Sequence, residues 1–352
     1  MRIAQSVRAL VPYVPGEQPR DASVVKLNTN ENPYPPSPRV ADVLASFDLD
    51  RLRRYPDPVF TDLRARLAAL NGTTPDRVFV GNGSDEVLTL MARAFVDDNE
   101  AIGAFDPSYS LYQTLAAIRD VPFVPSPLGE GFTWRAPVTR GADGRPVALF
   151  LLTNPNAPTS IRYPEADVAA FARAFPGVVA VDEAYVDFAD ASCMGLAAAP
   201  GNENVVVMRT LSKSFSLAGL RLGYCVGPAD LVEALYKVKD SYNVDALAQA
   251  VALAALGDLG WMRANAARVR TTRDAAAAAL RARGWDVPPS QTNFLFARPA
   301  HRPAAEIFEA LRARRIYVRH FPGPRTGERL RITVGTDADM ATLLSALKEL
   351  DR

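Results

Sequence analysis

The order of apolar and polar positions divides the chain into three stretches. The first forty residues are rich in proline and turn formers, as in "LVPYVPGEQP" and "LNTNENPYPP", and predict an extended arm. From about Phe60, helical stretches such as "FTDLRARLAAL" alternate with short apolar runs rich in β-branched residues. This alternation predicts an α/β fold with a mostly parallel central sheet, whose strands are buried on both faces.

A change of pattern near Leu231 predicts a second, smaller domain. The chain there becomes strongly helical and alanine-rich, as in "RDAAAAALRARG", and then gives the apolar runs "TNFLFARP", "RRIYVRHF" and "LRITVGT". We therefore expect an N-terminal arm over residues 1–40, a large domain over 41–235, and a smaller α+β domain over 236–352.

Composition and charge exclude several classes of function. The net charge of +1 favours neither a nucleic-acid nor a membrane partner. Cys193 and Cys225 match no metal or redox spacing, and the two histidines, His301 and His320, are too few for a typical metal site. No Gly-x-Gly-x-x-Gly follows a predicted strand, which argues against a nicotinamide dehydrogenase. The cysteine spacing and the small number of histidines lead us to expect no metal. Because the segment near residue 1 has no long apolar run, we expect a cytoplasmic protein.

Lys213 is the first candidate for chemistry. Only five of the 40 Lys+Arg residues are lysine, and this one follows an apolar run, between two serines, in "TLSKSFSLAGLRLGY". Arginine does not lose its proton in proteins, whereas a desolvated lysine becomes a nucleophile toward carbonyl groups. The sequence therefore points to imine chemistry at Lys213.

Further polar residues stand where other predicted strands end. A glycine turn, "GNGSDE", leads into a helix and could present backbone N–H groups to a phosphate. Each such residue taken singly has an ordinary structural explanation as a cap, a turn or a solvated edge. Together, an amine, a carboxylate, a phenol, an amide and an arginine suit pyridoxal 5′-phosphate (PLP). The residues concerned are Ser84, Asp85, Tyr109, Asn156, Asp182, Tyr185, Thr210, Ser212, Lys213 and Arg221.

The motifs in this order resemble a known family. "TLSKSFSLAGLRLGY" is similar to the PLP-lysine signature of fold-type I aminotransferases. With "LNTNENPYPP", "RYPDP", "NGSDE", "NPNAPT", "VDEAY" and "LRITVGT", nearly the whole chain resembles the histidinol-phosphate aminotransferases. The resemblance implies a fold-type I PLP-dependent transferase of histidine biosynthesis. It would exchange an amino group between L-histidinol phosphate and 2-oxoglutarate, giving imidazole-acetol phosphate and L-glutamate.

The resemblance also implies a role for each cofactor residue. Lys213 would bind PLP covalently and shuttle a proton, Asp182 would pair with the ring nitrogen, and Tyr185 would contact the 3′-oxygen. The Tyr109 ring would stack on the cofactor. The phosphate would be held by the Ser84 and Asp85 amides, the Thr210 and Ser212 hydroxyls and Arg221. Tyr55 resembles the tyrosine that reaches the partner subunit's cofactor phosphate, which implies a homodimer with shared active sites.

On the substrate side, Arg331 resembles an arginine that binds both a phosphate and the carboxylate of glutamate, because a guanidinium fits either anion. Arg319 is similar to a second phosphate-binding arginine, Tyr13 to an arm tyrosine that closes over the substrate, and Asn30 to an asparagine of the substrate pocket. Two alternatives stay open: an aromatic amino-acid aminotransferase, and a PLP-dependent threonine-phosphate decarboxylase.

One departure from the family pattern concerns the usual Asn-Pro-Thr-Gly motif. The chain has Ala157 before Pro158, and Ser160 where glycine is usual. Asn156 is therefore the candidate for the contact with the 3′-oxygen, and Asn154 is the other asparagine that could take this place.

Overall fold

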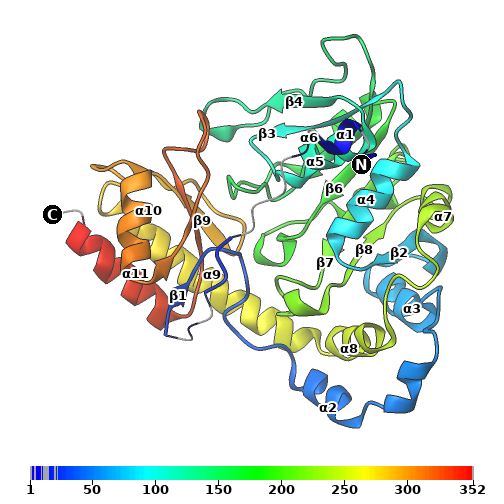
Figure 1. Cartoon of the computed structure of the whole chain (residues 1–352), viewed down its shortest axis with the longest axis horizontal. Coiled ribbons are helices and arrows are strands. Elements are labelled where there is room, and N and C mark those ends of the chain that lie inside the picture. The colour runs from blue at the N-terminus through cyan, green and yellow to red at the C-terminus, as the bar shows by residue number, and fades with distance from the viewer. Residues whose placement is uncertain are drawn as a thin grey trace.

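The computed structural model describes residues 2–3, 5–8, 10, 16–19, 21 and 23–350. Its centre is a seven-stranded sheet in the order β2-β8-β7-β6-β5-β3-β4, in which β8 runs antiparallel to both neighbours (Figure 1). This arrangement confirms the predicted α/β class with a mostly parallel sheet. The strands are β2 (Val78–Gly81), β3 (Ala101–Asp106), β4 (Phe123–Pro127), β5 (Val147–Thr153), β6 (Val178–Asp182), β7 (Val205–Thr210) and β8 (Gly223–Val226).

Helices cover both faces of this large sheet. Side chains of β7 alternate between the two sides: Val206 and Met208 contribute to one apolar cluster, Val205 and Val207 to the other. Burial on both faces explains why the strands are continuous apolar runs in the sequence. The first cluster includes residues of α4 (Ser84–Ala94), α5 (Leu111–Arg119) and α7 (Ala229–Val238). The second includes residues of α2 (Pro38–Ser46), α3 (Thr61–Leu70), α6 (Glu165–Ala174) and α8 (Ala246–Leu256).

A second apolar core lies in what we call the small-sheet region, residues 25–27 and 276–350. Its three-stranded antiparallel sheet has the order β11-β12-β9, and a separate parallel pair joins β1 of the N-terminal arm to β10. The elements are β1 (Val25–Lys26), β9 (Phe294–Ala297), β10 (Ile316–Tyr317), β11 (Arg319–His320), β12 (Leu330–Thr333), α10 (Ala304–Ala313) and α11 (Asp337–Leu350). The domain limits at residues 40 and 235 stay predictions.

One long helix joins the two regions. α9 (Leu259–Arg281) has 23 residues and is therefore about 35 Å long. Near its start, Met262 and Val269 pack in a cluster with Tyr34 and Tyr185, and near its end Leu280 belongs to the small-sheet core (Figure 1). The remaining helical elements are α1 (Gln5–Arg8), η1 (Leu49–Arg53), η2 (Pro75–Arg77), η3 (Glu130–Phe132), η4 (Val186–Phe188), η5 (Met194–Ala197) and η6 (Ala218–Leu220). Within the described residues, every helix is too short or too polar to cross a bilayer.

Candidate active site

A cavity of about 450 Å³ opens where the parallel strands β3, β5, β6 and β7 end, and residues of the small-sheet region close its other side. Ligands of open α/β sheets bind at this edge. Twelve of the fifteen residues singled out in the sequence line the cavity. They are Asn30, Ser84, Asp85, Tyr109, Asp182, Tyr185, Thr210, Ser212, Lys213, Arg221, Arg319 and Arg331.

Lys213 follows β7 and brings its amine into this cavity. Its Nζ lies 3.5 Å from the carbonyl oxygen of Thr29 and 5.9 Å from the centre of the Tyr185 ring. Burial, the main cause, and the neighbouring Arg331 cation, the second, together lower the pKa of Lys213 to about 8. About a tenth of the amine is therefore neutral at pH 7, and nucleophilic attack on a carbonyl requires this neutral form.

Asp182, the last residue of β6, is a buried carboxylate with two donors. Its Oδ1 accepts a hydrogen bond from the backbone N–H of Ala184 at 3.1 Å, and its Oδ2 accepts one from the Tyr112 hydroxyl at 2.8 Å. Burial outweighs these two hydrogen bonds, which act in the opposite direction, and the pKa of Asp182 is raised to about 6. A cation bound against this carboxylate would favour its ionised form.

Tyr185 and Asn30 are joined to each other. The Asn30 Nδ2 donates to the Tyr185 hydroxyl at 3.0 Å, and the Asn30 Oδ1 accepts from the Thr333 hydroxyl at 3.0 Å. The Tyr185 ring packs edge-on against Phe294, with 5.1 Å between ring centres. Asn30 of the arm thus links the Tyr185 hydroxyl to Thr333 of β12, and its side chain supports Tyr185 in addition to lining the cavity.

A glycine turn and an arginine form a cradle at the start of α4. Gly83 has a φ of 86°, and a Cβ at this position would lie 2.8 Å from Nη2 of Arg221, so only glycine fits. Arg221 Nη2 also lies 3.3 Å from Asp85 Oδ2, and the Thr210 and Ser212 hydroxyls are 2.9 Å apart. N–H groups at a helix start, two hydroxyls and a guanidinium suit a phosphate group.

Arg319 and Arg331 enter the cavity from the small-sheet region. β11 and β12 are antiparallel, and their register sets these two residues directly opposite each other. Both guanidinium groups lie near the Phe321 ring, at 5.3 and 5.2 Å from its centre, and Arg331 also donates to the carbonyl oxygen of Asn28 at 2.7 Å. The two cations therefore share one face of the hairpin and one end of the cavity.

Asn156 lies behind the cavity wall and is fully buried. Its Nδ2 donates to the Pro107 carbonyl oxygen at 3.1 Å and to the Thr159 hydroxyl at 2.9 Å, and its Oδ1 accepts from Ser108 at 3.2 Å. Asn154 is directed elsewhere, since its Nδ2 donates to the Tyr163 carbonyl oxygen. Neither asparagine lines the cavity, but Asn156 directly precedes Ala157 and Pro158, which do.

Two further sequence candidates are not in the cavity of this chain. Tyr55 is 80% exposed and stacks on Tyr242, with 4.3 Å between ring centres. Its predicted role concerns the partner subunit, so an exposed position is compatible with that role. Tyr13 lies outside the described residues.

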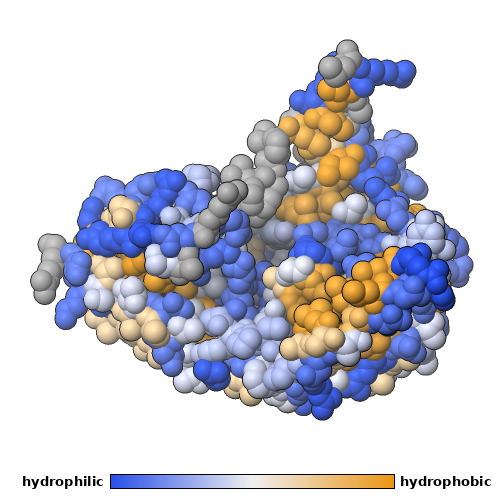
Figure 2. All heavy atoms as spheres, turned by 60° about the horizontal axis from the view of Figure 1, so that its bottom comes forward, coloured by the Kyte–Doolittle hydropathy of each residue, from blue (hydrophilic) through white to orange (hydrophobic). Residues whose placement is uncertain are grey.

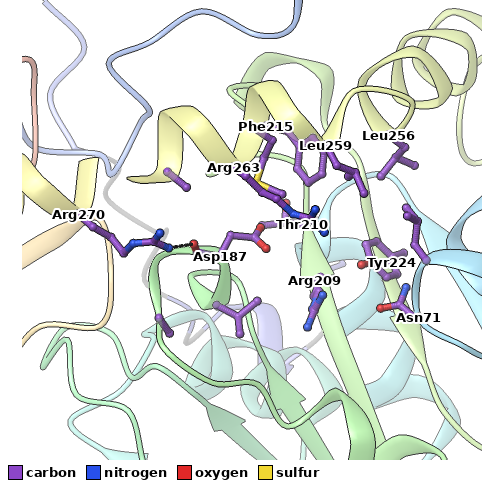
Figure 3. Close-up of a pocket in the computed structure, with 15 residues that line it drawn as sticks. Asn71, Asp187, Arg209, Thr210, Phe215, Tyr224, Leu256, Leu259, Arg263 and Arg270 are labelled. Carbon is purple, nitrogen blue, oxygen red and sulfur yellow. Dashed lines mark hydrogen bonds between the residues drawn. The ribbon is translucent and has the colours of Figure 1, made fainter. Parts of the chain in front are cut away.

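A second cavity, of about 430 Å³, lies between β7, η4 and the start of α9 (Figure 3). Thr210 is the one sequence candidate in its lining. Two arginines of this second cavity have partners within the fold: Arg209 donates to Glu183 at 2.9 and 3.0 Å, and Arg270 donates to the carbonyl oxygen of Asp187 at 3.2 Å. We therefore assign the chemistry to the cavity that contains Lys213.

The sequence interpretation missed the residues that support Asp182. Tyr112 stands three positions after Tyr109 in "SYSLY", at the second position of α5, whereas Tyr109 precedes the helix. The tyrosine was indistinguishable from a core residue in the sequence, because its partner Asp182 is 70 positions away. Gln18, Gln113 and Phe321 also line the cavity without a sequence signal.

The cavity combines a buried amine, a buried carboxylate and an anion cradle at the ends of parallel strands. This combination suits an enzyme that uses imine chemistry on a phosphorylated cofactor, and comparison with known proteins identifies the family. The chain belongs to the class I and II aminotransferases, whose family model matches residues 22–347. The chain is 46% identical to histidinol-phosphate aminotransferase 1 of Burkholderia pseudomallei (strain K96243) over 351 residues, 98% of this chain and 97% of that protein.

Two other proteins agree with this assignment. The histidinol-phosphate aminotransferase of Geobacter sp. (strain M21) is 42% identical, with 99% of this chain and 98% of that protein covered. The crystal structure of histidinol-phosphate aminotransferase from Sinorhizobium meliloti, in complex with pyridoxal-5′-phosphate, is similar with a TM-score of 0.88 at 25% identity, covering 100% of this chain and 98% of that chain. The predicted family resemblance is thus confirmed.

Proposed function

We propose that this aminotransferase is PLP-dependent and exchanges an amino group between L-histidinol phosphate and 2-oxoglutarate, as a cytoplasmic enzyme of histidine biosynthesis. The observation that carries the substrate is the pairing of Arg319 opposite Arg331 across β11 and β12. Like charges directly opposite each other on a sheet repel. Their juxtaposition in a cavity favours a ligand with more than one negative charge, such as a phosphate monoester. The names of the relatives support the same substrate.

The groups around Lys213 fit PLP. Gly83 has no side chain, so Arg221 can lie against its backbone. The phosphate would be held here by Arg221, the Ser84 and Asp85 amides and the Thr210 and Ser212 hydroxyls. Asp182 would face the ring nitrogen, Tyr185 and Asn156 the 3′-oxygen side, and Tyr109 the ring. When bound, PLP supplies a carbonyl group for the amino donor and a protonated ring that withdraws electrons.

The chain's own residues would then orient the reactants and move one proton. Lys213 Nζ would hold the cofactor covalently and would be freed by the amino donor. Because its pKa is lowered to about 8, the freed amine could accept the proton from the donor carbon. It would then deliver this proton to the C4′ atom of the cofactor. Asp182 would remain ionised beside the ring cation, and the Tyr185 hydroxyl would stay oriented by Asn30.

The two arginines would orient both substrates. Arg331 presents a planar donor pair that fits a phosphate or the carboxylate of glutamate, and Arg319 adds a second cation for the doubly charged phosphate. Tyr13 would close over the substrate from the arm. A single site can in this way accept histidinol phosphate and glutamate in alternate half-reactions.

We further propose a homodimer whose active sites are shared. Several exposed apolar side chains lie between the end of α2 and the start of α3, and Figure 2 shows hydrophobic side chains gathered on this side of the molecule. They are Leu44, Leu49, Leu52, Tyr55 and Val59, and the exposed Tyr242 stacks on Tyr55. A second copy of the chain would cover them, and Tyr55 of the partner subunit would reach the cradle at Arg221.

A half-reaction on the purified enzyme tests the function. L-Histidinol phosphate is added without a keto acid while the absorption band of the lysine-bound cofactor is recorded, with L-phenylalanine and L-threonine phosphate in parallel. We expect the band to disappear fastest with histidinol phosphate and to return with 2-oxoglutarate. A faster loss with phenylalanine would make the enzyme an aromatic aminotransferase, and release of carbon dioxide from threonine phosphate would make it the decarboxylase.

A further inference from the structure

A buried chain of hydroxyl groups runs from Asp182 to Asn156. The Tyr112 hydroxyl lies 2.8 Å from Asp182 Oδ2 and 2.7 Å from Thr153 Oγ1. The Ser108 hydroxyl lies 3.2 Å from Thr153 Oγ1 and 3.2 Å from Asn156 Oδ1. Four contacts therefore connect the carboxylate that would face the cofactor ring with an asparagine behind the cavity wall.

Both ends of this chain are hydrogen-bond acceptors. Asn156 Nδ2 donates to the carbonyl oxygen of Pro107, which can only accept, so the Oδ1 atom must be the one that faces Ser108. An ionised carboxylate at Asp182 also only accepts. Three hydroxyls, with one proton each, thus serve four contacts.

The distances indicate where the protons lie. The two short contacts, 2.7 and 2.8 Å, are at the Asp182 end, as expected if Thr153 donates to Tyr112 and Tyr112 donates to Asp182. Both contacts of Ser108 are longer, at 3.2 Å, and share the single remaining proton. The chain is therefore directed toward a negative charge on Asp182.

The ring of Tyr112 has a second contact in the cavity wall. It packs edge-on against the Tyr109 ring, with 5.6 Å between ring centres at an angle of 81°. Tyr112 is fully buried near the start of α5, one position after the first residue of the helix. One side chain thus contacts both the carboxylate and the aromatic ring that would bracket the cofactor.

We propose that Tyr112 is a positioning residue for the cofactor: with Thr153 behind it, its hydroxyl keeps Asp182 ionised and directed into the cavity, and its ring sets the plane of Tyr109. This inference rests on the proposed use of PLP, but not on the identity of the substrate. It assigns to Tyr112 and Thr153 a role in binding the cofactor that neither their position in the sequence nor their burial alone would suggest.

Two carboxylates near Asp182 act against its ionisation. Asp85 and Glu183 both raise the pKa of Asp182, and burial raises it most. The hydrogen bonds from Tyr112 and from the backbone of Ala184 act in the opposite direction. Removing the Tyr112 hydroxyl therefore raises the pKa of Asp182, and the carboxyl becomes protonated at a higher pH than in the parent protein.

The test measures PLP affinity rather than turnover. In a Lys213→Ala background, where the lysine no longer titrates, the dissociation constant for PLP is measured by protein fluorescence between about pH 5 and pH 9. Tyr112→Phe should weaken binding about tenfold near pH 6.5, the scale of one charge-assisted hydrogen bond, and should move the low-pH loss of affinity to higher pH. Thr153→Val should shift it in the same direction, by less.

Tyr163→Phe is the matched control, because Tyr163 is also buried and its hydroxyl donates to a backbone carbonyl, that of Phe132, at 3.2 Å. It should leave the pH profile of PLP binding unchanged. The double variant Tyr112→Phe/Thr153→Val should bind PLP no more weakly than Tyr112→Phe alone, since the chain is already interrupted.

Two results would overturn the proposal: a Tyr112→Phe profile that coincides with the parent, or one that Tyr163→Phe reproduces. A failure of the histidinol-phosphate half-reaction would leave this measurement intact, because no amino donor takes part in it. The two proposals can therefore fail separately.

Discussion

The cavity contains two sets of polar residues, one around Lys213 and one around Arg331, and different parts of the fold hold them in place. Asp182 and Thr210 end long buried strands of the large sheet, and their side chains are hydrogen-bonded to neighbours within the fold. Arg319 and Arg331 stand on a short hairpin of the small-sheet region and lie half-buried near Phe321. The first set is fixed by the sheet core, whereas the second is positioned by the packing of one region on the other.

This difference suits two separate tasks, binding of the cofactor by the first set and binding of the substrates by the second. A cofactor that stays bound through many cycles needs fixed partners, and buried strand ends provide them. In the proposed reaction, substrates that enter and leave at each half-reaction would bind to a surface that belongs to another part of the molecule. Each prediction below alters one of these two sets or the link between them.

The largest effect is expected at Lys213. Lys213→Ala removes the nucleophile and the proton carrier together, so transamination should fall by at least about a thousandfold and the visible band of the lysine-bound cofactor should vanish. Absorption spectra and the half-reaction measure both. Undiminished turnover in this variant would show that the chemistry lies elsewhere.

The next effect should separate the two sets of residues. Arg319→Ala should lower kcat/KM for histidinol phosphate by about ten- to a hundredfold, the scale of one or two charged hydrogen bonds, and for glutamate by far less. Arg298→Ala is the control, because Arg298 is half-exposed and pairs with Asp286 and Glu328 outside the cavity. An equal loss for both substrates would remove Arg319 from phosphate binding.

A smaller effect is expected from a change at the exposed apolar surface. Leu52→Asp sets a charge on the face that a second copy would cover, so the protein should become mostly monomeric and lose activity about tenfold. Sedimentation velocity reports the association state. Val138→Asp, at another exposed apolar position, should leave it unchanged. A Leu52→Asp variant that sediments like the parent would contradict the proposed interface.

The smallest expected effect is the influence of the Arg331 charge on the pKa of Lys213. The pKa of Lys213 is lowered to about 8, so the rate at which the apoenzyme captures PLP should rise about tenfold per pH unit below this value and level off above it. Arg331 contributes to the lowering. Arg331→Ala should therefore raise the pKa and move the rising limb to higher pH, as stopped-flow absorbance can record. An unmoved limb would mean that the two groups are electrostatically independent.

The sequence was most informative where chemistry follows a strand directly. Lys213, Asp182 and Thr210 each come at the end of an apolar run, and parallel strands must bring their carboxyl ends to one edge. The resemblance to a family then supplied the residues on loops and in the second region. Their roles stay predictions, but the cavity contains twelve of the fifteen.

Contacts between distant positions could not be predicted in this way. The bond from Tyr112 to Asp182 spans 70 positions, and the register that sets Arg319 opposite Arg331 depends on a hairpin whose strands have two and four residues. The direction of the Asn156 side chain follows from its bonds to Pro107 and Thr159, which no local pattern encodes. Tertiary packing decides these features, and local propensity does not.

Because α9 is long, a small rotation about one of its ends displaces the other end by several ångströms. The helix is anchored beside Tyr185 at one end and in the small-sheet core at the other, about 35 Å away. A turn of about 5° about its first end would carry the far end through roughly 3 Å, simply from the lever arm of such a rod. A tilt that barely disturbs the residues around Lys213 would thus be enough to bring two guanidinium groups into or out of hydrogen-bond distance of an anion.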